Sequence, residues 1–535
     1  MNFNLKDSSP SLRVRLKQGL LLAVMLVAFR YAGAQVKSDT QKTTDSIRTL
    51  IVFFDGLRPD YITAGGMPRL YAFKQQACYG MKHHSVFPTV TRVNSSSYST
   101  GSYPATHGLM GNTVYFPQVD KVKGLNTGEA AELNRIDSAT HGQLLTAGTS
   151  LGQVLQQAGK KFMVFSSGST GQALLQNHTL SGGITINPTM ILPDSYRQRV
   201  ISDIGAPPAG GKSAAAGHAW VTDALMKWGL IPEGPLVNAV WYSEPDGAAH
   251  QYGIGSPQAR AALKLVDTQF GRILDSLKSR KMDGITNILI STDHGFVTYV
   301  GKQRLADFLI KQGLKKDTAS DDVVVAEGAI YIKDHDKETV QKIVTALQEQ
   351  EWIGPVFTKE KRQGDLKGWV AGTLSFESVH WNHKDRAADI LTASNWDDRT
   401  NGEGYAGASY STGVAGHGGL SPYEVYIPLM AAGPGFKKQY TDTLPTSNVD
   451  LVPTVLHLHH LPVPETMDGR VMHELLVESN DMKMPVAVAE TIAPSADLKN
   501  STYQTELHRT VLGKYKYVDF ARTRRGQPQK VSASR

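Results

Sequence analysis

Four separated clusters of Asp, His and Thr give this chain of 535 residues the side chains that metal-dependent chemistry needs. In chain order they are Asp55; Thr89, Thr91 and Asn94 within residues 87–94; Asp246 with His250; and Asp293 next to His294, with His417 as a distant partner. Zinc binds imidazole nitrogens and carboxylate oxygens where thiolates are lacking. Cys78 is the only cysteine, so a thiolate zinc site and an intrachain disulfide are both excluded.

Each cluster also has an ordinary structural explanation. A strand-end Asp such as Asp55 often caps a helix, and a His between glycines, such as His417, can be a plain loop residue. Asp246 and His250 are four residues apart, so one helical turn would place them on the same face. The residues alone leave both Thr89 and Thr91 open as a nucleophile.

The positions of the clusters favour the functional interpretation. Short apolar runs at 49–54, 161–165, 236–242, 285–290 and 426–432 predict buried strands. Residues 256–278 have apolar side chains at helical spacing, and the alternation of strands and helices predicts a mostly parallel sheet with helices on both faces. In such a sheet the ligand site lies beyond the carboxyl ends of the strands, where Asp55, Asp246 and Asp293 stand.

The N-terminus predicts export. Arg13, Arg15 and Lys17 precede an apolar run at 19–29, and small residues at 32–34 suit a signal peptidase, so we expect a signal peptide over 1–34 and a periplasmic or secreted enzyme. The run is too short to span a bilayer, so no stable membrane insertion is expected after cleavage, although an uncleaved anchor stays open. Most of the formal charge of +7 belongs to residues 1–34, and the rest of the chain has no Lys/Arg run apart from Arg522, Arg524 and Arg525 near its end. This mild excess argues against a nucleic-acid partner.

The ordered motifs resemble those of the nucleotide pyrophosphatase/phosphodiesterase branch of the alkaline phosphatase superfamily. The matching segments are 53–60, 88–94, 100–108, Glu244-Pro245-Asp246 with His250 and Gly253, 291–295, 416–418, 450–454 and 467–470. The resemblance covers residues 49 to 476. It implies an alkaline-phosphatase-like three-layer αβα sandwich with an inserted cap subdomain.

The resemblance also implies two zinc ions and a division of their ligands. One ion would be held by Asp246, His250 and His417. The other would be held by Asp55, Asp293, His294 and Thr91. Thr91 would attack phosphorus, giving a phosphorylated threonine that water then hydrolyses, and Asn94 would donate to a non-bridging phosphate oxygen.

One departure from the family bears on the substrate. Many diesterases of this branch have Phe-Pro-Asn after the nucleophile, whereas here Arg92-Val93-Asn94 follow Thr91. A guanidinium beside the nucleophile could bind a phosphate oxygen and favour a monoester over a diester. The alternative is that Arg92 points away and pairs with an acid.

The leading prediction is a secreted phosphodiesterase or nucleotide pyrophosphatase acting on small phosphate esters, nucleotides among them. A phosphomonoesterase, a phosphonate hydrolase with the same metal set, and a non-catalytic metal-binding protein are the alternatives. The predicted organisation is a signal at 1–34, a polar leader at 35–48, a catalytic domain at 49–296 and 411–478, a cap at 297–410 and an extension at 479–535.

Overall fold

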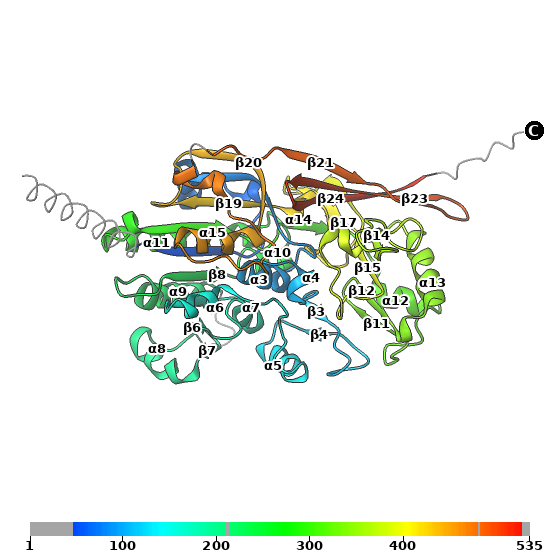
Figure 1. Cartoon of the computed structure of the whole chain (residues 1–535), viewed down its shortest axis with the longest axis horizontal. Helices are drawn as coiled ribbons and strands as arrows, with labels where there is room; N and C mark the ends of the chain where they lie inside the picture. Colours follow the sequence, from blue (N-terminus) through cyan, green and yellow to red (C-terminus); the bar gives the residue numbers. More distant parts are fainter. Residues whose placement is uncertain (1–46, 209–213, 480–481, 527–535) are drawn as a thin grey trace, which may run out of the picture. The chain divides into compact units, whose positions relative to one another are not determined.

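A nine-stranded sheet forms the centre of the computed structural model, which describes residues 47–208, 214–479 and 482–526 (Figure 1). Across the sheet the strands are β20 (Tyr440–Ser447), β2 (Cys78–His84), β19 (Tyr426–Ala432), β9 (Thr286–Ser291), β1 (Arg48–Phe54), β8 (Val237–Tyr242), β5 (Phe162–Ser166), β6 (Ile184–Asn187) and β7 (Met190–Leu192). Only β19 and β7 run opposite to the other strands of this sheet. The predicted α/β fold with a mostly parallel sheet is confirmed.

Strand β1 explains how the sheet is covered on both faces. Its side chains are buried from Thr49 to Phe54, and successive residues point to opposite faces. Leu50, Val52 and Phe54 pack into one apolar cluster, whereas Ile51 and Phe53 pack into another. A strand buried on both faces needs a nearly continuous apolar run, which is what residues 49–54 supply.

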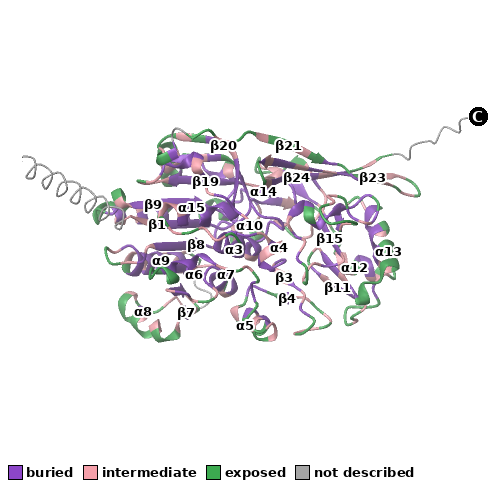
Figure 2. Ribbon diagram, viewed as in Figure 1, coloured by how far each residue is buried: buried purple, intermediate pink, exposed green. Residues whose placement is uncertain are grey.

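Helices supply the other side of each cluster. The first cluster includes residues of α2 (Pro68–Gln76), α9 (Ala214–Ala224) and α11 (Pro257–Ser279). The second includes residues of α3 (Thr91–Thr100), α6 (Leu151–Gln157) and α15 (Leu451–Leu458). Figure 2 shows the strands between these helices as the most buried part of the molecule.

Residues 297–410, together with Ala415 and Gly416, form two further sheets between β9 and β19 in the chain. A five-stranded sheet contains β11 (Val323–Ala326), β12 (Ala329–Ile332), β15 (Ile390–Ser394), β13 (Ile353–Thr358) and β14 (Leu374–Ser375). It packs against α12 (Leu305–Lys311) and α13 (Lys337–Gln348) in an apolar cluster of its own. A four-stranded sheet joins β16 (Trp396–Thr400), β17 (Ala406–Ser409), β10 (Val297–Tyr299) and β18 (Ala415–Gly416).

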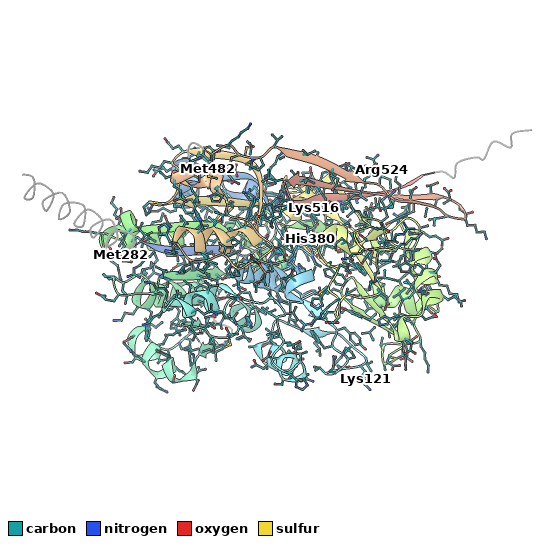
Figure 3. All side chains as sticks on the ribbon, viewed as in Figure 1. Lys121, Met282, His380, Met482, Lys516 and Arg524 are labelled. Atoms are coloured by element: carbon teal, nitrogen blue, oxygen red, sulfur yellow. The ribbon has the colours of Figure 1, made fainter. Side chains whose placement is uncertain are left out.

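The end of the described chain forms a separate antiparallel sheet. It contains β21 (Ala487–Ile492), β22 (Ser495–Asp497), β23 (Thr502–Leu512) and β24 (Tyr515–Gly526). His380 of the 297–410 region donates its ring Nε2–H to the Lys516 carbonyl at 2.8 Å (Figure 3). Leu507 and Val518 of this sheet share an apolar cluster with Phe357 on β13. The C-terminal sheet therefore braces the 297–410 region.

The predicted signal peptide and leader lie outside the described residues. Among the helices that are described, none combines the length and the apolar character needed to cross a bilayer. The described part from Arg48 onward belongs to one compact unit.

Candidate active site

Three adjacent strands deliver the acidic residues to one edge of the central sheet. β8, β1 and β9 are neighbours and run in the same direction. Asp55 directly follows β1, Asp293 and His294 follow β9, and Asp246 begins α10 (Asp246–Tyr252) shortly after β8. Parallel strands end at the same edge, so the topology alone brings these carboxylates together.

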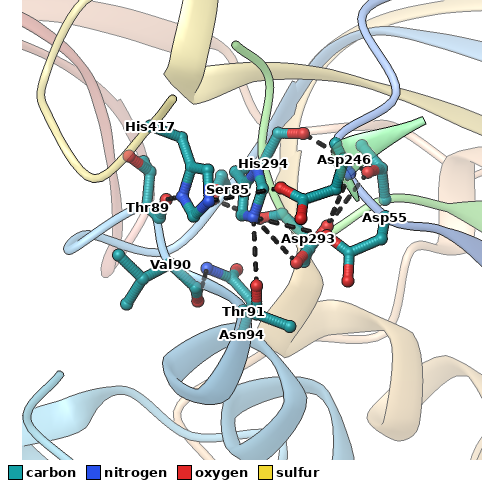
Figure 4. Close-up of polar contacts among 12 residues, drawn as sticks. Asp55, Ser85, Thr89, Val90, Thr91, Asn94, Asp246, Asp293, His294 and His417 are labelled. Atoms are coloured by element: carbon teal, nitrogen blue, oxygen red, sulfur yellow. Dashed lines mark hydrogen bonds and ion pairs between the residues drawn. The ribbon is translucent and has the colours of Figure 1, made fainter. Parts of the chain in front are cut away.

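Asp55, Asp293 and His294 form one group of buried residues that can hold a metal ion. His294 Nε2 lies 3.0 Å from Asp293 Oδ2 and 3.6 Å from Asp55 Oδ1 (Figure 4). The second oxygen of each carboxylate is held by the protein. Trp241 Nε1–H donates to Asp55 Oδ2 at 3.0 Å, and the Gly56 N–H donates to Asp293 Oδ1 at 3.1 Å.

A second group adjoins the first. Asp246, His294 and His417 have ligand atoms close enough to share one ion, so His294 belongs to both groups. Asp246 Oδ1 lies 3.2 Å from His250 Nε2 and 3.4 Å from His417 Nε2. The residues predicted as ligands are therefore all gathered at two adjacent places.

The three histidines are oriented in the same way. Each donates its Nδ1–H to a backbone carbonyl, which leaves Nε2 as the atom directed at the carboxylates. The pairs are His250 with Ala415 at 2.9 Å, His294 with Gly295 at 3.0 Å, and His417 with Thr89 at 2.8 Å. Such a carbonyl contact fixes the tautomer and orientation of a metal-ligating imidazole.

This arrangement fits a divalent cation. Asp55 Oδ1, Asp246 Oδ1 and Asp293 Oδ2 are shielded from solvent and have no hydrogen-bond partner among the described residues. Burial, and then the charges of Asp293 and Asp246, raise the pKa of Asp55 well above the usual carboxyl range. Burial and the neighbouring His294 lower the pKa of His417 to about 4, so its ring is neutral at pH 7 and has a lone pair to offer. A bound cation would satisfy all these groups at once.

The structure separates the two threonines that sequence alone left open. Thr89 is committed to the loop that carries His417: its hydroxyl donates to the Gly419 carbonyl at 2.9 Å and accepts from the Gly418 N–H at 3.1 Å. Thr91 is the first residue of α3, and its Oγ1 lies 3.2 Å from His294 Nε2 (Figure 4). Thr91 is therefore the hydroxyl at the metal-binding groups.

Asn94 does not have the position expected of a phosphate donor. Its Nδ2 donates to the carbonyls of Val86 and Val90 at 3.0 and 3.2 Å. Its Oδ1 accepts from the Val86 N–H at 2.9 Å and from Asn448 Nδ2 at 3.0 Å. Fully buried and fully bonded, Asn94 braces the segment before α3. The geometry contradicts the predicted contact with phosphate.

Asn112 is a site residue that the sequence analysis missed. Its Oδ1 accepts from the backbone N–H of Arg92 at 2.9 Å, beside Thr91. Asn112 also lines a cavity of about 480 Å³ together with His250 and His417. Its side-chain NH₂ has no partner among the described residues, so Asn112 has the free donor that Asn94 lacks. The Met110-Gly111-Asn112 loop has no catalytic spacing of its own, which is why the sequence did not reveal it.

The cavity lies between the catalytic part and the 297–410 region. The catalytic part contributes Phe87 and Met110 to its wall, whereas the 297–410 region contributes Arg304, Glu327 and Trp352. A molecule bound at the metal-binding groups would extend into this space.

A further group of His457, His473 and Glu478 could also hold a metal ion. It lies at the C-terminal end of α15 and in the following segment, and the adjacent His459 contacts Thr49 at the start of β1, the end opposite to Asp55. It plays no part in the site described above.

The family model described as "Type I phosphodiesterase / nucleotide pyrophosphatase" matches residues 49–407. The chain belongs to this family. The predicted membership of this family of hydrolases is confirmed, and the match includes five of the six Asp and His residues proposed as metal ligands, with His417 outside it.

One relative of this family is similar to about half of the chain. Bis(5'-adenosyl)-triphosphatase enpp4 of Xenopus laevis is 24% identical to this chain over 275 residues. The aligned part is 51% of this chain and 52% of the frog protein. The chain thus spans about half the length of that relative.

Two solved structures share the fold. An inactive threonine-to-alanine variant of murine ectonucleotide pyrophosphatase/phosphodiesterase 5 in complex with AMP has a TM-score of 0.55 and 20% identity, covering 78% of this chain and 96% of that one. A mutant of the alkaline phosphatase PafA has a TM-score of 0.59 and 15% identity, covering 80% and 98%. The alkaline-phosphatase-like architecture that the sequence predicts is confirmed.

Proposed function

We propose that this protein is a secreted, two-zinc hydrolase of phosphoric esters that works through a phosphorylated Thr91. The observation that carries the proposal is the Thr91 hydroxyl 3.2 Å from His294 Nε2, beside two adjacent metal-binding groups. Asp55, Asp293 and His294 would hold one ion. Asp246, His250 and His417 would hold the other. Divalent cations at such a site neutralise phosphate charge and acidify a neighbouring hydroxyl.

The residues of the chain supply the rest of the chemistry. Thr91 Oγ loses its proton and attacks phosphorus in line with the leaving group. The phosphorus–oxygen bond to the leaving group breaks, and the departing oxygen gains a proton. Asn112 donates to a non-bridging oxygen that gains charge in the transition state. Water then cleaves the bond between phosphorus and Thr91, releasing phosphate or its remaining ester and restoring the hydroxyl.

Replacement of Thr91 tests the proposal. We expect Thr91→Ala to lower kcat on bis-p-nitrophenyl phosphate by at least about 10³-fold, because a nucleophile is lost. Zinc content, measured by inductively coupled plasma mass spectrometry, is expected to stay near two per chain. Thr268→Ala, which removes an exposed threonine hydroxyl on α11, is the matched control and should keep full activity. Near-normal turnover by Thr91→Ala would refute the nucleophile assignment.

Diester and pyrophosphate bonds are the substrate class that family membership supports. The name of the frog relative specifies a dinucleoside triphosphatase, and the murine relative binds AMP. We propose small nucleotide-like phosphate esters as substrates, with the leaving or retained group in the cavity beside His250 and His417. A panel of mono- and diesters assayed with purified protein tests this. No turnover of any member, with zinc bound, would reject it.

Export is proposed from residues 1–34 alone. Expression of the full chain followed by cell fractionation and N-terminal sequencing tests it. We expect the mature protein outside the cytoplasm with Gln35 as its first residue. An intact N-terminus in the cytoplasmic fraction would contradict the prediction.

A further inference from the structure

Arg92 is a cation beside the nucleophile that the protein itself does not neutralise. It is the second residue of α3, directly after Thr91. Its Nε atom is shielded from solvent and has no hydrogen-bond partner among the described residues. No described carboxylate lies within ion-pair distance of its guanidinium: the ion pairs of the described chain involve other cations. The prediction that Arg92 pairs with an acid is therefore not supported.

The surroundings keep the guanidinium near the site. The loop after β4 (Leu125–Asn126) lies against it: a Cβ added to Gly128 would stand 3.6 Å from Arg92 Nη2. The same loop supports Asn112, since the Thr127 hydroxyl donates to the Asn112 carbonyl at 2.6 Å. Asn112 in turn accepts from the Arg92 N–H at 2.9 Å. Arg92 and the free amide of Asn112 are thus held by one small loop next to Thr91.

Glu327, the acidic residue that lines the cavity, does not form an ion pair with Arg92. Glu327, in the turn between β11 and β12, accepts from the Asn112 N–H at 3.2 Å. Loss of hydration raises the pKa of Glu327, and the positive charge of Arg92 acts against that rise. Arg92 is therefore within electrostatic range of Glu327 but beyond ion-pair distance. An unpaired, partly buried guanidinium is costly unless an anion binds to it.

We propose that Arg92 binds a negatively charged oxygen on the reacting phosphorus, so that it selects for substrates whose phosphoryl group carries a second negative charge. A phosphate monoester has such an oxygen at the place where a diester has its second organic group. A planar guanidinium suits this contact because it can donate two parallel hydrogen bonds to a phosphate. The inference rests on the proposed function, because it assumes that Thr91 attacks phosphorus.

The test compares a monoester and a diester that release the same leaving group, p-nitrophenol. kcat/KM is measured for p-nitrophenyl phosphate and bis-p-nitrophenyl phosphate on the zinc-loaded full chain. We expect Arg92→Gln to lower the monoester-to-diester ratio about 10- to 100-fold, the usual effect of losing a charge-assisted hydrogen bond. Arg92→Lys keeps the positive charge but loses the planar guanidinium that donates two parallel hydrogen bonds. Its monoester-to-diester ratio should therefore fall less than that of Arg92→Gln. A ratio unchanged in Arg92→Gln would overturn the proposal.

Two controls separate selection from general damage. Arg524→Gln makes the same change at an exposed arginine of β24 that does not line the cavity, and it should leave the ratio unchanged. Inhibition by inorganic phosphate and by dimethyl phosphate reports binding without turnover: in Arg92→Gln only the inhibition constant for phosphate should rise, by the same factor. An equal rise for both inhibitors would also refute selection by charge. A wild-type enzyme that cleaves neither ester would instead refute the proposed function.

Discussion

Asn94 and Asn112 have the same side chain but contrasting surroundings. Asn94 donates to and accepts from its neighbours on every side, so its amide contributes to stability. Asn112 accepts one hydrogen bond, from Arg92, and keeps its NH₂ free beside the cavity. A catalytic donor must be oriented by one contact and still be free to make another.

This contrast predicts opposite effects of two substitutions. Asn112→Ala should lower kcat about 10²- to 10³-fold, because a donor to the transition state is removed, with little change in melting temperature. Asn94→Ala should cost about 1–3 kcal/mol of unfolding free energy, because buried partners lose their hydrogen bonds. Steady-state kinetics and denaturant unfolding of both variants check the prediction. Loss of kcat in a stable Asn94→Ala would reverse the assignment.

The loop 417–421 shows how an element positions a ligand. Glu424 accepts from the Gly419 N–H at 2.8 Å, and the Thr89 hydroxyl joins Gly418 to Gly419. His417 itself is fixed through the Thr89 carbonyl. The segment before α3 and the His417 loop therefore form one unit, even though they are more than 300 residues apart in the chain.

Thr89→Val tests this coupling, since it keeps the shape of the side chain but removes the hydroxyl. We expect zinc affinity to fall about 10- to 100-fold, as is usual when the support of a ligand is lost. Titration with a competing chelator measures the affinity. Activity should return at excess zinc, because Thr91 is intact. A variant that binds zinc normally but does not turn over would point to a catalytic role for Thr89 instead.

The strands that the sequence predicted are those that are apolar from end to end. β1, β5, β8, β9 and β19 match the predicted runs within one or two residues, and α11 matches the predicted helix. β2 was missed because its sequence, Cys78 to His84, mixes polar and apolar residues, although His83 and His84 are buried. Residues 323–332, an apolar run inside the predicted cap, form a hairpin of β11 and β12 that turns at Glu327.

The candidate metal ligands Asp55, Asp293 and His294 were predictable because they follow apolar strands, whereas the proposed phosphate donor was not. The family resemblance favoured Asn94, but only the fold shows that its amide is used internally. Asn112 and the unpaired guanidinium of Arg92 depend on the loop at 126–128, which has no distinctive sequence. Contacts between distant segments decide which polar side chain stays free.

Strand β20 carries a buried acid that makes stability depend on pH. Burial, and then the negative charge of Glu474, raise the pKa of Asp442 to about 7. An unfolded aspartate has a pKa of about 3.9. Between these values the unfolded chain releases a proton that the folded chain retains, so Asp442 lowers stability as pH rises from about 4 to about 7.

Asp442→Asn should remove this loss, because an amide stays neutral. The variant is expected to be roughly 1–3 kcal/mol more stable than the wild type at pH 8, with the difference disappearing near pH 4. Denaturant unfolding of both proteins at each pH measures it. A difference of the same size at both pH values would show that Asp442 is not protonated in the folded protein at pH 4 to 7.

For the whole molecule, the metal-binding groups link activity to stability. Without cations, Asp55, Asp246 and Asp293 place three acidic groups together in a buried site. EDTA should therefore abolish turnover and lower the melting temperature by a few degrees or more, because the folded state alone binds the ions. Added zinc should restore both. Unchanged melting with lost activity would place the ions outside the folded core.

The order of strands in the central sheet determines when the strands can pair during synthesis of the chain. β2 lies between β19 and β20 in the sheet. The ribosome makes β2 early, and both of its partners are synthesised more than 300 residues later. At a synthesis rate of roughly 5–20 residues per second, that wait is about 20 to 70 seconds. During this interval β2 has neither of its partners, and Asp246, once made, still lacks His417. The enzyme thus gains its active site only as the last third of the chain emerges, and we expect pairing between such distant segments to slow its folding.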